Sequence, residues 1–441
     1  MRTLISDAIL INPTVPPRIE DPGWVLLQGD RVHSIGPGSP PNGLLEGTDC
    51  HVKARRGILL PGLVNAHTHA AMTLFRGLAD DLPLTEWLEG VIFPVEAKAV
   101  GEESVYWGTL LACAEMILSG TTSFGNAYFY EDSALAAVKE SGMRAVMAQG
   151  VLDFSTPDCQ DPKAALERAV AFVERCRDQD PVRCGIFCHS PYTCSPETLV
   201  RAKDVCRAHG IPFFIHVSET RWEVEEIRRR FGSTPVRHLE GLGLLDHWSV
   251  LIHGVWVDDD EIRILADTGA ALVTCTESNM KLASGIAPLP HFLAHGLRVG
   301  LGTDGPASNN DLDMFGEMDM TAKLHKVKGA DPTIVDASTV LNLATQGGAL
   351  ALGWEDVGLL EPGYKADLIL VRTDKPNLQP LYNPVSQVVY AATGADVDTV
   401  WIGGRMILEA RRLLTLDANQ IIRNIKRLSS KIQSNPQMAS W

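Results

Sequence analysis

Several features that would identify other classes of protein are missing from this sequence. No window of the 441 residues reaches the ~18–20 consecutive apolar residues of a membrane span. The first residues have neither an uninterrupted apolar stretch nor a small-residue cleavage site, so we expect no signal peptide. Positive charge is scarce, with 39 Lys and Arg against 54 Asp and Glu and a formal net charge of −15. Such a surface repels polyphosphate, which argues against nucleic acid as a partner.

Cysteine pairs with the spacing of a redox or zinc-ribbon site are also missing. The nine cysteines are an odd number, and no two of them form C-x-x-C. Most lie in apolar or helical surroundings, such as Cys113. We expect them to be buried, reduced thiols, which together with the missing membrane span predicts a cytoplasmic protein.

The middle of the chain alternates strand-like and helix-like patterns. Apolar runs that end in polar residues occur eight times, at 59–69, 121–126, 144–152, 182–189, 212–219, 249–253, 270–277 and 298–304. Helical patterns separate them, for example at 102–119, 133–141, 164–178, 196–209 and 258–268. Continuous apolar strands that alternate with helices predict a parallel sheet, and eight such strands can close into a barrel.

Short strands broken by turns are found at both ends of the chain. They are expected at 4–11, 24–27, 367–371, 387–390 and 400–402. The predicted fold class is therefore α/β, a (β/α)₈ TIM-type barrel at 59–362 with a small β-sandwich formed by both termini, 1–58 and 363–441.

One more helix is expected near the C-terminus. Asp417 can cap it, and its apolar face carries Ile421, Ile425, Leu428 and Ile432. That face can pack against the body of the protein or against a second copy in a homo-oligomer.

Five polar residues at the ends of expected strands predict a metal site. His67 and His69 point to the same side of the first strand because they are two residues apart. His216, His253 and Asp304 end the fifth, sixth and eighth strands. Singly, each could be a packed core histidine or a helix-capping aspartate. Jointly at one barrel face they need a shared partner, and three imidazoles with a carboxylate suit Zn²⁺, while Fe²⁺ or Mn²⁺ would accept the same set.

With these residues the chain resembles the amidohydrolase superfamily, a (β/α)₈ barrel with a small β-sandwich. The resemblance spans nearly the whole length, from the 61–69 segment to the 358–367 stretch. It implies that His67, His69, His216 and Asp304 hold the metal. Binuclear members bridge two ions with a lysine or glutamate from strand three or four. Gln149 to Val151 and Cys188-His189 stand there, so one ion per subunit is expected.

His216 to Glu219 looks like the H-x-x-E of the deaminase branch of this superfamily. Without the metal set, Glu219 would be better explained as a charge at a helix N-terminus. With it, the resemblance implies a catalytic group of Glu219, His253 and Asp304. Asp304 takes a proton from water, His253 holds the attacking oxygen, and Glu219 protonates the ring nitrogen before ammonia leaves.

The segments 75–88, 93–96, 278–285 and 304–310 are similar to the 5′-methylthioadenosine/S-adenosylhomocysteine deaminases. That resemblance implies hydrolytic deamination of the adenine ring of a small nucleoside, with adenosine a further candidate. Glu96 would bind the ribose hydroxyls, and His189 would help to seat the nucleoside. Trp87 would form an apolar wall, or it is ordinary lid packing. Glu219 and Asp304 would also contact the substrate.

Other functions remain open from the sequence. A guanine-type base deaminase or a triazine hydrolase would share the metal set, but neither substrate has a ribose for Glu96 to hold. A non-catalytic structural barrel is the alternative outside enzymes, although such members generally lose metal ligands. Many relatives carry an arginine near the end of strand three, where this chain has Ala148-Gln149. That difference favours methylthioadenosine or adenosine over S-adenosylhomocysteine.

Overall fold

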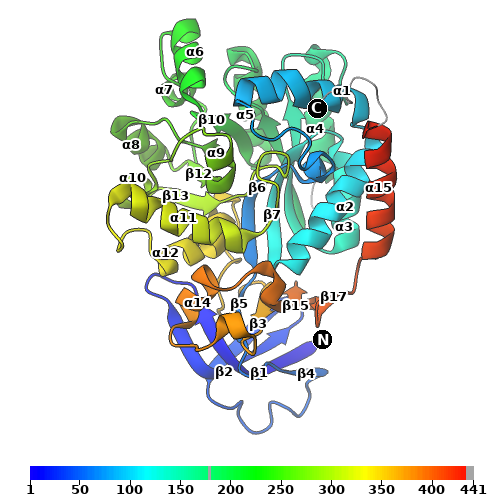
Figure 1. Ribbon diagram of the computed structural model, residues 1–441, viewed down its shortest axis with the longest axis vertical. Helices are drawn as coiled ribbons and strands as arrows, with labels where there is room; N and C mark the ends of the chain where they lie inside the picture. The colour runs from blue at the N-terminus through cyan, green and yellow to red at the C-terminus, as the bar shows by residue number, and fades with distance from the viewer. Residues whose placement is uncertain (177–179, 434–441) are drawn as a thin grey trace.

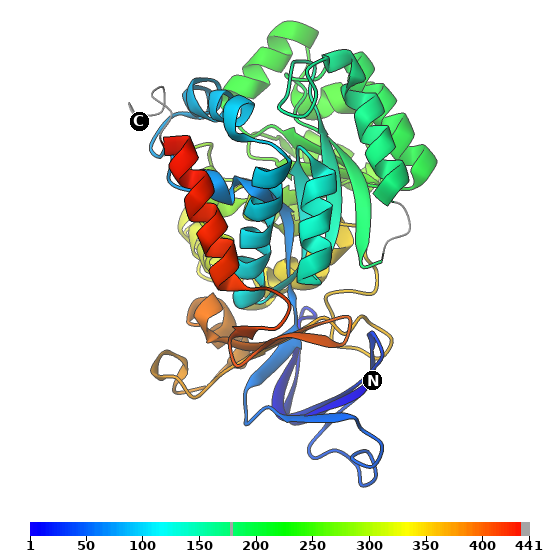
Figure 2. The ribbon, with the colours of Figure 1, turned by 90° about the vertical axis from the view of Figure 1, so that its right-hand side faces the viewer.

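The computed structural model describes residues 1–176 and 180–433. Within this part of the chain the strands form two sheets, one of eight strands and one of nine. Figures 1 and 2 show the eight-stranded sheet enclosed by helices in the upper part of the molecule, with the nine-stranded sheet below it.

The eight-stranded sheet is the barrel, and its strands follow one another in chain order with parallel pairing. They are β6 (Leu63–Thr68), β7 (Thr121–Tyr128), β8 (Arg144–Val151), β9 (Val182–Cys188), β10 (Phe213–Val217), β11 (Ser249–His253), β12 (Ala271–Thr274) and β13 (Arg298–Leu301). Nearly every residue in them is buried, because helices cover one face and barrel side chains the other. β13 packs beside β6, so the sheet nearly closes and the predicted barrel is confirmed.

Helices surround the barrel. The main ones are α1 (Phe93–Ala99), α2 (Glu102–Leu118), α3 (Glu131–Ser141), α4 (Ala165–Cys176), α5 (Pro196–His209), α6 (Arg221–Phe231), α7 (Pro235–Gly241), α8 (Asp259–Thr268), α9 (Thr276–Lys281), α10 (Leu289–Ala294), α11 (Met314–Gly329), α12 (Ala337–Asn342) and α13 (Gly348–Ala351). Local signals set their ends. Ser195 Oγ accepts from Thr198 N at the start of α5, and Asp258 forms a capping box with Glu261 at α8.

Shorter helical segments complete the connections. They are the 3₁₀ turns η1 (Ala70–Phe75), η3 (Pro162–Ala164), η5 (Pro376–Leu378) and η6 (Gly394–Asp396), and the π-helical η2 (Glu86–Ile92) and η4 (Leu343–Gly347). Of these, η2 runs directly into α1 and covers the mouth of the barrel with it.

Both ends of the chain contribute to the nine-stranded sheet. Its strands are β1 (Arg2–Asn12), β2 (Arg18–Gln28), β3 (Arg31–Pro37), β4 (Cys50–Lys53), β5 (Ile58–Pro61), β14 (Leu368–Val371), β15 (Val397–Ile402), β16 (Arg405–Glu409) and β17 (Arg412–Leu413). The N-terminal and C-terminal strands meet where β5 pairs antiparallel with β14. The expected small β unit built from both termini is therefore confirmed.

The buried pair Arg144–Asp367 joins this sheet to the barrel. Arg144 opens β8 and Asp367 precedes β14, and Arg144 Nε donates to Asp367 Oδ2 over 2.6 Å. Asp367 Oδ1 also accepts from Gly403 N. The two side chains are only 3% and 2% exposed, so the Asp367 carboxylate depends on Arg144 for charge compensation, while Arg144 Nη1 also lies 3.4 Å from Asp180 Oδ1.

Three strand predictions need correction. The run 387–390 belongs to a helix, α14 (Pro384–Tyr390), because Asn383 caps it and a proline takes its first position. The run 59–69 divides at Gly62 into β5 and β6, which belong to different sheets. A Cβ at Gly62 would lie 2.1 Å from Thr122 Oγ1, so only glycine allows this close crossing.

The third correction concerns the run 270–277, which ends as a strand at Thr274. Helix α9 then begins at Thr276. The buried Glu317 carboxylate accepts hydrogen bonds from Thr276 N and Glu277 N, and so satisfies backbone donors at the start of that helix.

The last predicted helix is present as α15 (Ala418–Gln433) and lies along α2 (Figure 2). Asp417 Oδ1 accepts from Gln420 N, as expected of a cap. Ile421 and Leu428 are buried, and Ile425 and Ile432 pack against the same core. Among the helices of residues 1–176 and 180–433, none combines the length and apolarity needed to cross a membrane.

Candidate active site

The predicted site residues lie together at the carboxyl end of the barrel strands. His67 is near the end of β6 and His69 directly follows that strand. His216 lies in β10, His253 is the last residue of β11, and Asp304 follows β13. All five are within the barrel mouth, where parallel-strand barrels place their reactive groups.

The backbone at these strand ends is bent to aim the side chains inward. His253 and Asp304 have φ of 77° and 61°, and Ser218, next to Glu219, has φ of 53°. Left-handed conformations of non-glycine residues cost on the order of 1–3 kcal/mol each, so the surrounding contacts must hold them. Asp304 N donates to His67 O over 3.0 Å, which secures one of these bends.

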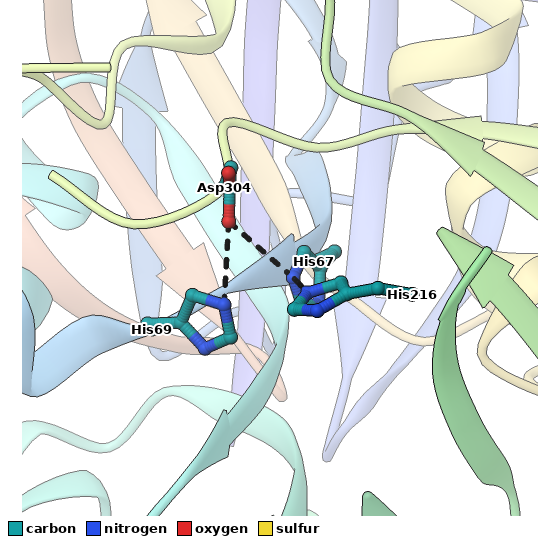
Figure 3. Close-up of side chains that lie close together, drawn as sticks. All are labelled: His67, His69, His216 and Asp304. Atoms are coloured by element: carbon teal, nitrogen blue, oxygen red, sulfur yellow. Dashed lines mark hydrogen bonds and ion pairs between the residues drawn. The ribbon is translucent and has the colours of Figure 1, made fainter. Parts of the chain in front are cut away.

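His67, His69, His216 and Asp304 form a metal-binding group, with one ligand atom from each inside a span of 4.8 Å (Figure 3). His216 Nε2 lies 3.2 Å from His67 Nε2. Asp304 Oδ1 lies 3.5 Å from His67 Nε2 and 3.3 Å from His69 Nε2. Tetrahedral zinc with bonds of about 2.1 Å separates its ligand atoms by roughly 3.4 Å, so these donors fit one such ion.

The protonation states of three of the four side chains, His67, His216 and Asp304, also suit a cation. Burial lowers the pKa of His67 to about 4 and that of His216 well below its ordinary value, which keeps both imidazoles neutral. His69 Nδ1 donates to Ala127 O, which leaves Nε2 as the free ligand nitrogen. Burial opposes ionisation of Asp304, but its contacts with the His67 and His69 rings hold its pKa well below its ordinary value.

Asp304 is held by two serines that the sequence argument did not identify. Ser278 Oγ donates to Asp304 Oδ2 over 2.7 Å, and Ser308 Oγ donates to the same oxygen over 3.0 Å. The two hydroxyls also lie 2.9 Å from each other. Ser278 belongs to α9 rather than to a strand end, so its only signal was its place in the motif at 278–285.

Glu219 and His253 face each other beside the metal-binding group. Glu219 Oε2 lies 3.6 Å from His253 Nε2, and Ser284 Oγ donates to Glu219 Oε1 over 3.1 Å. His253 Nδ1 is bound to Asn279 Oδ1 at 2.9 Å, which directs the other ring nitrogen toward Glu219. Burial raises the pKa of Glu219. A carboxyl group with a raised pKa retains its proton more readily and suits proton donation.

Glu223 supports the turn that carries Glu219. Its carboxylate oxygens accept from Ser218 N over 2.9 Å and from Glu219 N over 2.8 Å. Glu223 is buried, and burial raises its pKa to about 8. This residue could not be identified from the sequence, since its signal is only a charge on the first turn of α6.

A cavity of about 690 Å³ connects the metal-binding group with the predicted nucleoside contacts, and we call it the inner cavity. His69, His216, Glu219, His253 and Asp304 line it, as do Glu96, His189 and Trp87. His67 is completely buried behind it.

Glu96 reaches the inner cavity from α1. It is 4% exposed, and Tyr128 Oη donates to Glu96 Oε1 over 2.5 Å. Burial raises the pKa of Glu96 to about 7. Glu96 is therefore not a charge on the exposed surface of the helix.

His189 and Trp87 occupy two further parts of the cavity wall. His189 Nδ1 lies 3.1 Å from Thr193 Oγ1, and burial lowers the pKa of His189 to about 3, so the ring is neutral. Trp87 is 6% exposed and belongs to η2. Both side chains border the cavity, and the roles assigned to them from the sequence stay predictions.

Gln149 lies where binuclear relatives place a bridging ligand, and here it makes other contacts. Gln149 Nε2 donates to Asp158 Oδ2 over 2.8 Å, and Gln149 Oε1 accepts from Glu131 N. Within residues 1–176 and 180–433, the metal-binding group is the one set of at least three His, Cys, Asp or Glu side chains whose ligand atoms lie close enough together to hold a metal ion. We therefore expect one metal ion per chain.

Comparison with known proteins gives consistent results. The Amidohydrolase family model matches residues 58–407. The chain is 46% identical to the 5-methylthioadenosine/S-adenosylhomocysteine deaminase of Syntrophobacter fumaroxidans, covering 97% of this chain and 99% of that one. The same-named protein of Pelotomaculum thermopropionicum is 44% identical, with 95% and 96% covered.

A solved structure is similar over the same length. The crystal structure of an adenosine deaminase from Xanthomonas campestris with bound zinc superposes with a TM-score of 0.94 and 35% identity, covering 98% of each chain. The barrel, the metal-binding group and the comparisons all indicate the same family. The chain belongs to the amidohydrolase family and, within it, to the 5-methylthioadenosine/S-adenosylhomocysteine deaminase family.

Proposed function

We propose that this protein hydrolytically deaminates the adenine ring of 5′-methylthioadenosine or S-adenosylhomocysteine, giving the inosine analogue and ammonia, with one zinc ion per chain. The observation that supports this best is the position of Glu219. Its carboxyl group lies 3.6 Å from His253 in the same cavity as the metal-binding group and Glu96. A buried carboxyl group with a raised pKa at that place can supply the proton that a ring nitrogen needs before the amino group leaves.

A zinc ion at the four ligands, when bound, acts as a Lewis acid that lowers the pKa of a coordinated water toward neutrality. Asp304 accepts the proton that this water loses. In the structure both serine hydroxyls point at Asp304 Oδ2, but they also lie within hydrogen-bond distance of each other. Rotation of one hydroxyl onto the other frees an acceptor site on Asp304 for that proton.

Glu219 and His253 act on the two reacting partners. His253 Nε2 holds the attacking oxygen, and its orientation is maintained by Asn279. Glu219 gives its proton to the ring nitrogen next to the amino-bearing carbon, which makes that carbon electrophilic. The new C–O bond forms and the C–N bond breaks as the proton held by Asp304 passes to the departing amine. The proton of the new hydroxyl group returns to Glu219, so the products are the keto base and ammonia and Glu219 is protonated again.

Glu96 provides the nucleoside selectivity in this proposal. A carboxylate can accept from both hydroxyls of a vicinal diol, and the burial of Glu96 excludes competing water. His189 and Trp87 are assigned to the walls around the nucleoside. A guanine-type base or a triazine has no ribose and would leave Glu96 without a partner, which is why those alternatives are less favoured.

Other properties follow from the chemistry of the whole chain. A net charge of −15 disfavours nucleic acid as a partner. None of the nine cysteines, all of which lie in the described part of the chain, forms a disulfide. This fits a reducing compartment, and we propose the cytoplasm. A homo-oligomer is compatible with this proposal.

The experiment is a comparison of ammonia release, and of the adenine-to-hypoxanthine absorbance change, across methylthioadenosine, S-adenosylhomocysteine, adenosine and guanine. The proposal expects turnover of the nucleosides and none of guanine. Activity on guanine alone would contradict the nucleoside assignment. Protein with less than about one ion per chain and no activity on any of them would favour the structural barrel.

A further inference from the structure

A second cavity of about 1250 Å³ adjoins the inner cavity, and we call it the outer cavity. Four side chains border both cavities: Leu84, Leu88, Phe93 and Tyr192. They come from the segment that covers the barrel mouth and from the loop after β9. The two cavities therefore adjoin each other along a shared apolar boundary.

Two series of aromatic rings lead from the inner to the outer cavity. Both start at His189. In one, Phe93 lies 6.2 Å from His189 and 5.6 Å from Phe154 between ring centroids. In the other, Tyr192 lies 6.1 Å from His189 and 5.3 Å from Trp222. Phe154 and Trp222 line the outer cavity, so its walls present ring faces and edges.

Three of the four exposed aromatic residues in the described part of the chain line the outer cavity. Phe154, Trp222 and Phe231 are 39%, 44% and 38% exposed, and all three line it. Tyr382 is the fourth large aromatic residue that is exposed within residues 1–176 and 180–433. Exposed aromatic side chains that cluster around one cavity are typical of a binding surface, whereas exposed ones that are scattered singly are normal on any protein.

The charged groups of the outer cavity are mostly engaged with the protein itself. Arg230 pairs with Glu226, and its Nη1 donates to Tyr192 O over 2.8 Å. Asp153 accepts from Ser195 N and from a threonine hydroxyl of α5. Glu89 is exposed at the rim. The surface offered to a ligand is therefore mainly apolar and aromatic.

The position of Glu96 indicates which part of a nucleoside would reach this surface. Phe93 and Glu96 are three residues apart on α1, hence on the same side of that helix. A ribose held by Glu96 would lie next to Phe93, at the boundary of the two cavities. With the base directed at the metal-binding group, the 5′ carbon is the atom left to point outward.

We propose that the outer cavity binds the 5′ substituent of the nucleoside and favours an extended apolar thioether, an alkylthio or arylthio group, over the zwitterionic homocysteine tail. This inference rests on the proposed function. Sulfur makes favourable contacts with aromatic rings, and an apolar group would cover the exposed faces of Trp222 and Phe154. A carboxylate and an ammonium would instead have to compete with the existing partners of Arg230 and Asp153.

The test compares 5′-methylthioadenosine, 5′-benzylthioadenosine and S-adenosylhomocysteine as substrates of the wild type, Trp222→Ala, Phe154→Ala and Arg230→Gln. In the wild type we expect kcat/KM for the benzylthio compound to exceed that for the homocysteine compound. Trp222→Ala or Phe154→Ala should lower the benzylthio-to-methylthio ratio of kcat/KM by about tenfold. The matched control is Tyr382→Ala, an exposed aromatic residue that lines neither cavity, and it should leave the ratio unchanged.

A binding measurement separates this inference from the proposed function. Calorimetry with the products, 5′-benzylthioinosine and 5′-methylthioinosine, should show tighter binding of the benzylthio compound, and Trp222→Ala should remove the difference. If methylthioadenosine is not deaminated, the proposed function is wrong. The binding measurement still tests whether the outer cavity holds the 5′ substituent. Equal affinities for the two products, or a loss of S-adenosylhomocysteine turnover in Arg230→Gln with no effect of Trp222→Ala, overturns the inference.

Discussion

Ser278 Oγ donates to Asp304 Oδ2 over 2.7 Å, while Asp304 Oδ1 faces His67 and His69. The carboxylate therefore has one oxygen for the metal-binding group and one for the two serines. The next residue of α9, Asn279, orients His253 in a similar way, because its Oδ1 lies 2.9 Å from His253 Nδ1. One short helix thus orients two of the side chains that we propose to act in catalysis.

Removing the serine hydroxyls should impair both metal binding and turnover. Hydrogen-bond partners of metal ligands are typically worth 10–100-fold in affinity or activity, so Ser278→Ala should lower kcat by about tenfold and the double variant with Ser308→Ala by more. Metal content and kcat are to be measured on the same preparations. Ser430→Ala, on the exposed face of α15, is the control. Unchanged metal content and kcat in the double variant would show that the serines have no such role.

Loss of one ligand should abolish stoichiometric metal binding. We expect about one ion per wild-type chain by elemental analysis, and a small fraction of that in His216→Ala, because the three remaining donors lack the fourth bond. Chelation should remove activity from the wild type, and zinc should restore it. The control His33→Ala changes an exposed histidine of β3 and should keep about one ion. Two ions per wild-type chain would contradict the single-ion site.

The raised pKa of Glu96 predicts a pH dependence of nucleoside capture. Burial raises this pKa to about 7, so the group is neutral below that pH and a carboxylate above it. The carboxylate is the form that accepts both ribose hydroxyls, so kcat/KM for methylthioadenosine should rise with pH and level off above about 7. In Glu96→Gln that limb should disappear and KM should increase. An identical pH profile in the variant would assign the limb to another group.

The Arg144–Asp367 pair should dominate the coupling of the two sheets. Arg144→Met leaves the buried Asp367 carboxylate without its partner and should lower the free energy of unfolding by about 3–5 kcal/mol in urea denaturation. The double variant Arg144→Met/Asp367→Leu should recover part of that loss. Arg263→Met breaks an exposed pair with Asp260 and should cost at most about 1 kcal/mol. Equal costs for Arg144→Met and Arg263→Met would mean that the buried pair has no special weight.

The metal ligands could be predicted from the sequence because barrel topology determines where strand ends meet. His67, His216 and Asp304 are distant in the chain, yet each ends a recognisable apolar strand. Ser278 and Glu223 could not be found in this way. Both lie on helices, and a serine or a charge at a helix start has many ordinary explanations.

The same limit explains the errors of secondary structure. The run 387–390 is short and apolar, and periodicity alone does not separate a buried strand from a buried helical turn of that length. The proline at 384 and the cap Asn383 were the signals that mattered. The contact of Glu96 with Tyr128 joins residues 32 positions apart and depends on how α1 lies over the barrel, which no local pattern reports.

Glu219→Gln tests the central claim, that this metal-dependent hydrolase is a deaminase with Glu219 as proton donor. With methylthioadenosine as substrate and metal content measured in parallel, we expect kcat to fall by about 10²–10⁴-fold while about one ion per chain is retained. The control is Glu225→Gln. Glu225 is an exposed glutamate on α6, the helix that follows Glu219, and this variant should have the kcat of the wild type. Near-normal turnover by metal-loaded Glu219→Gln would contradict the account.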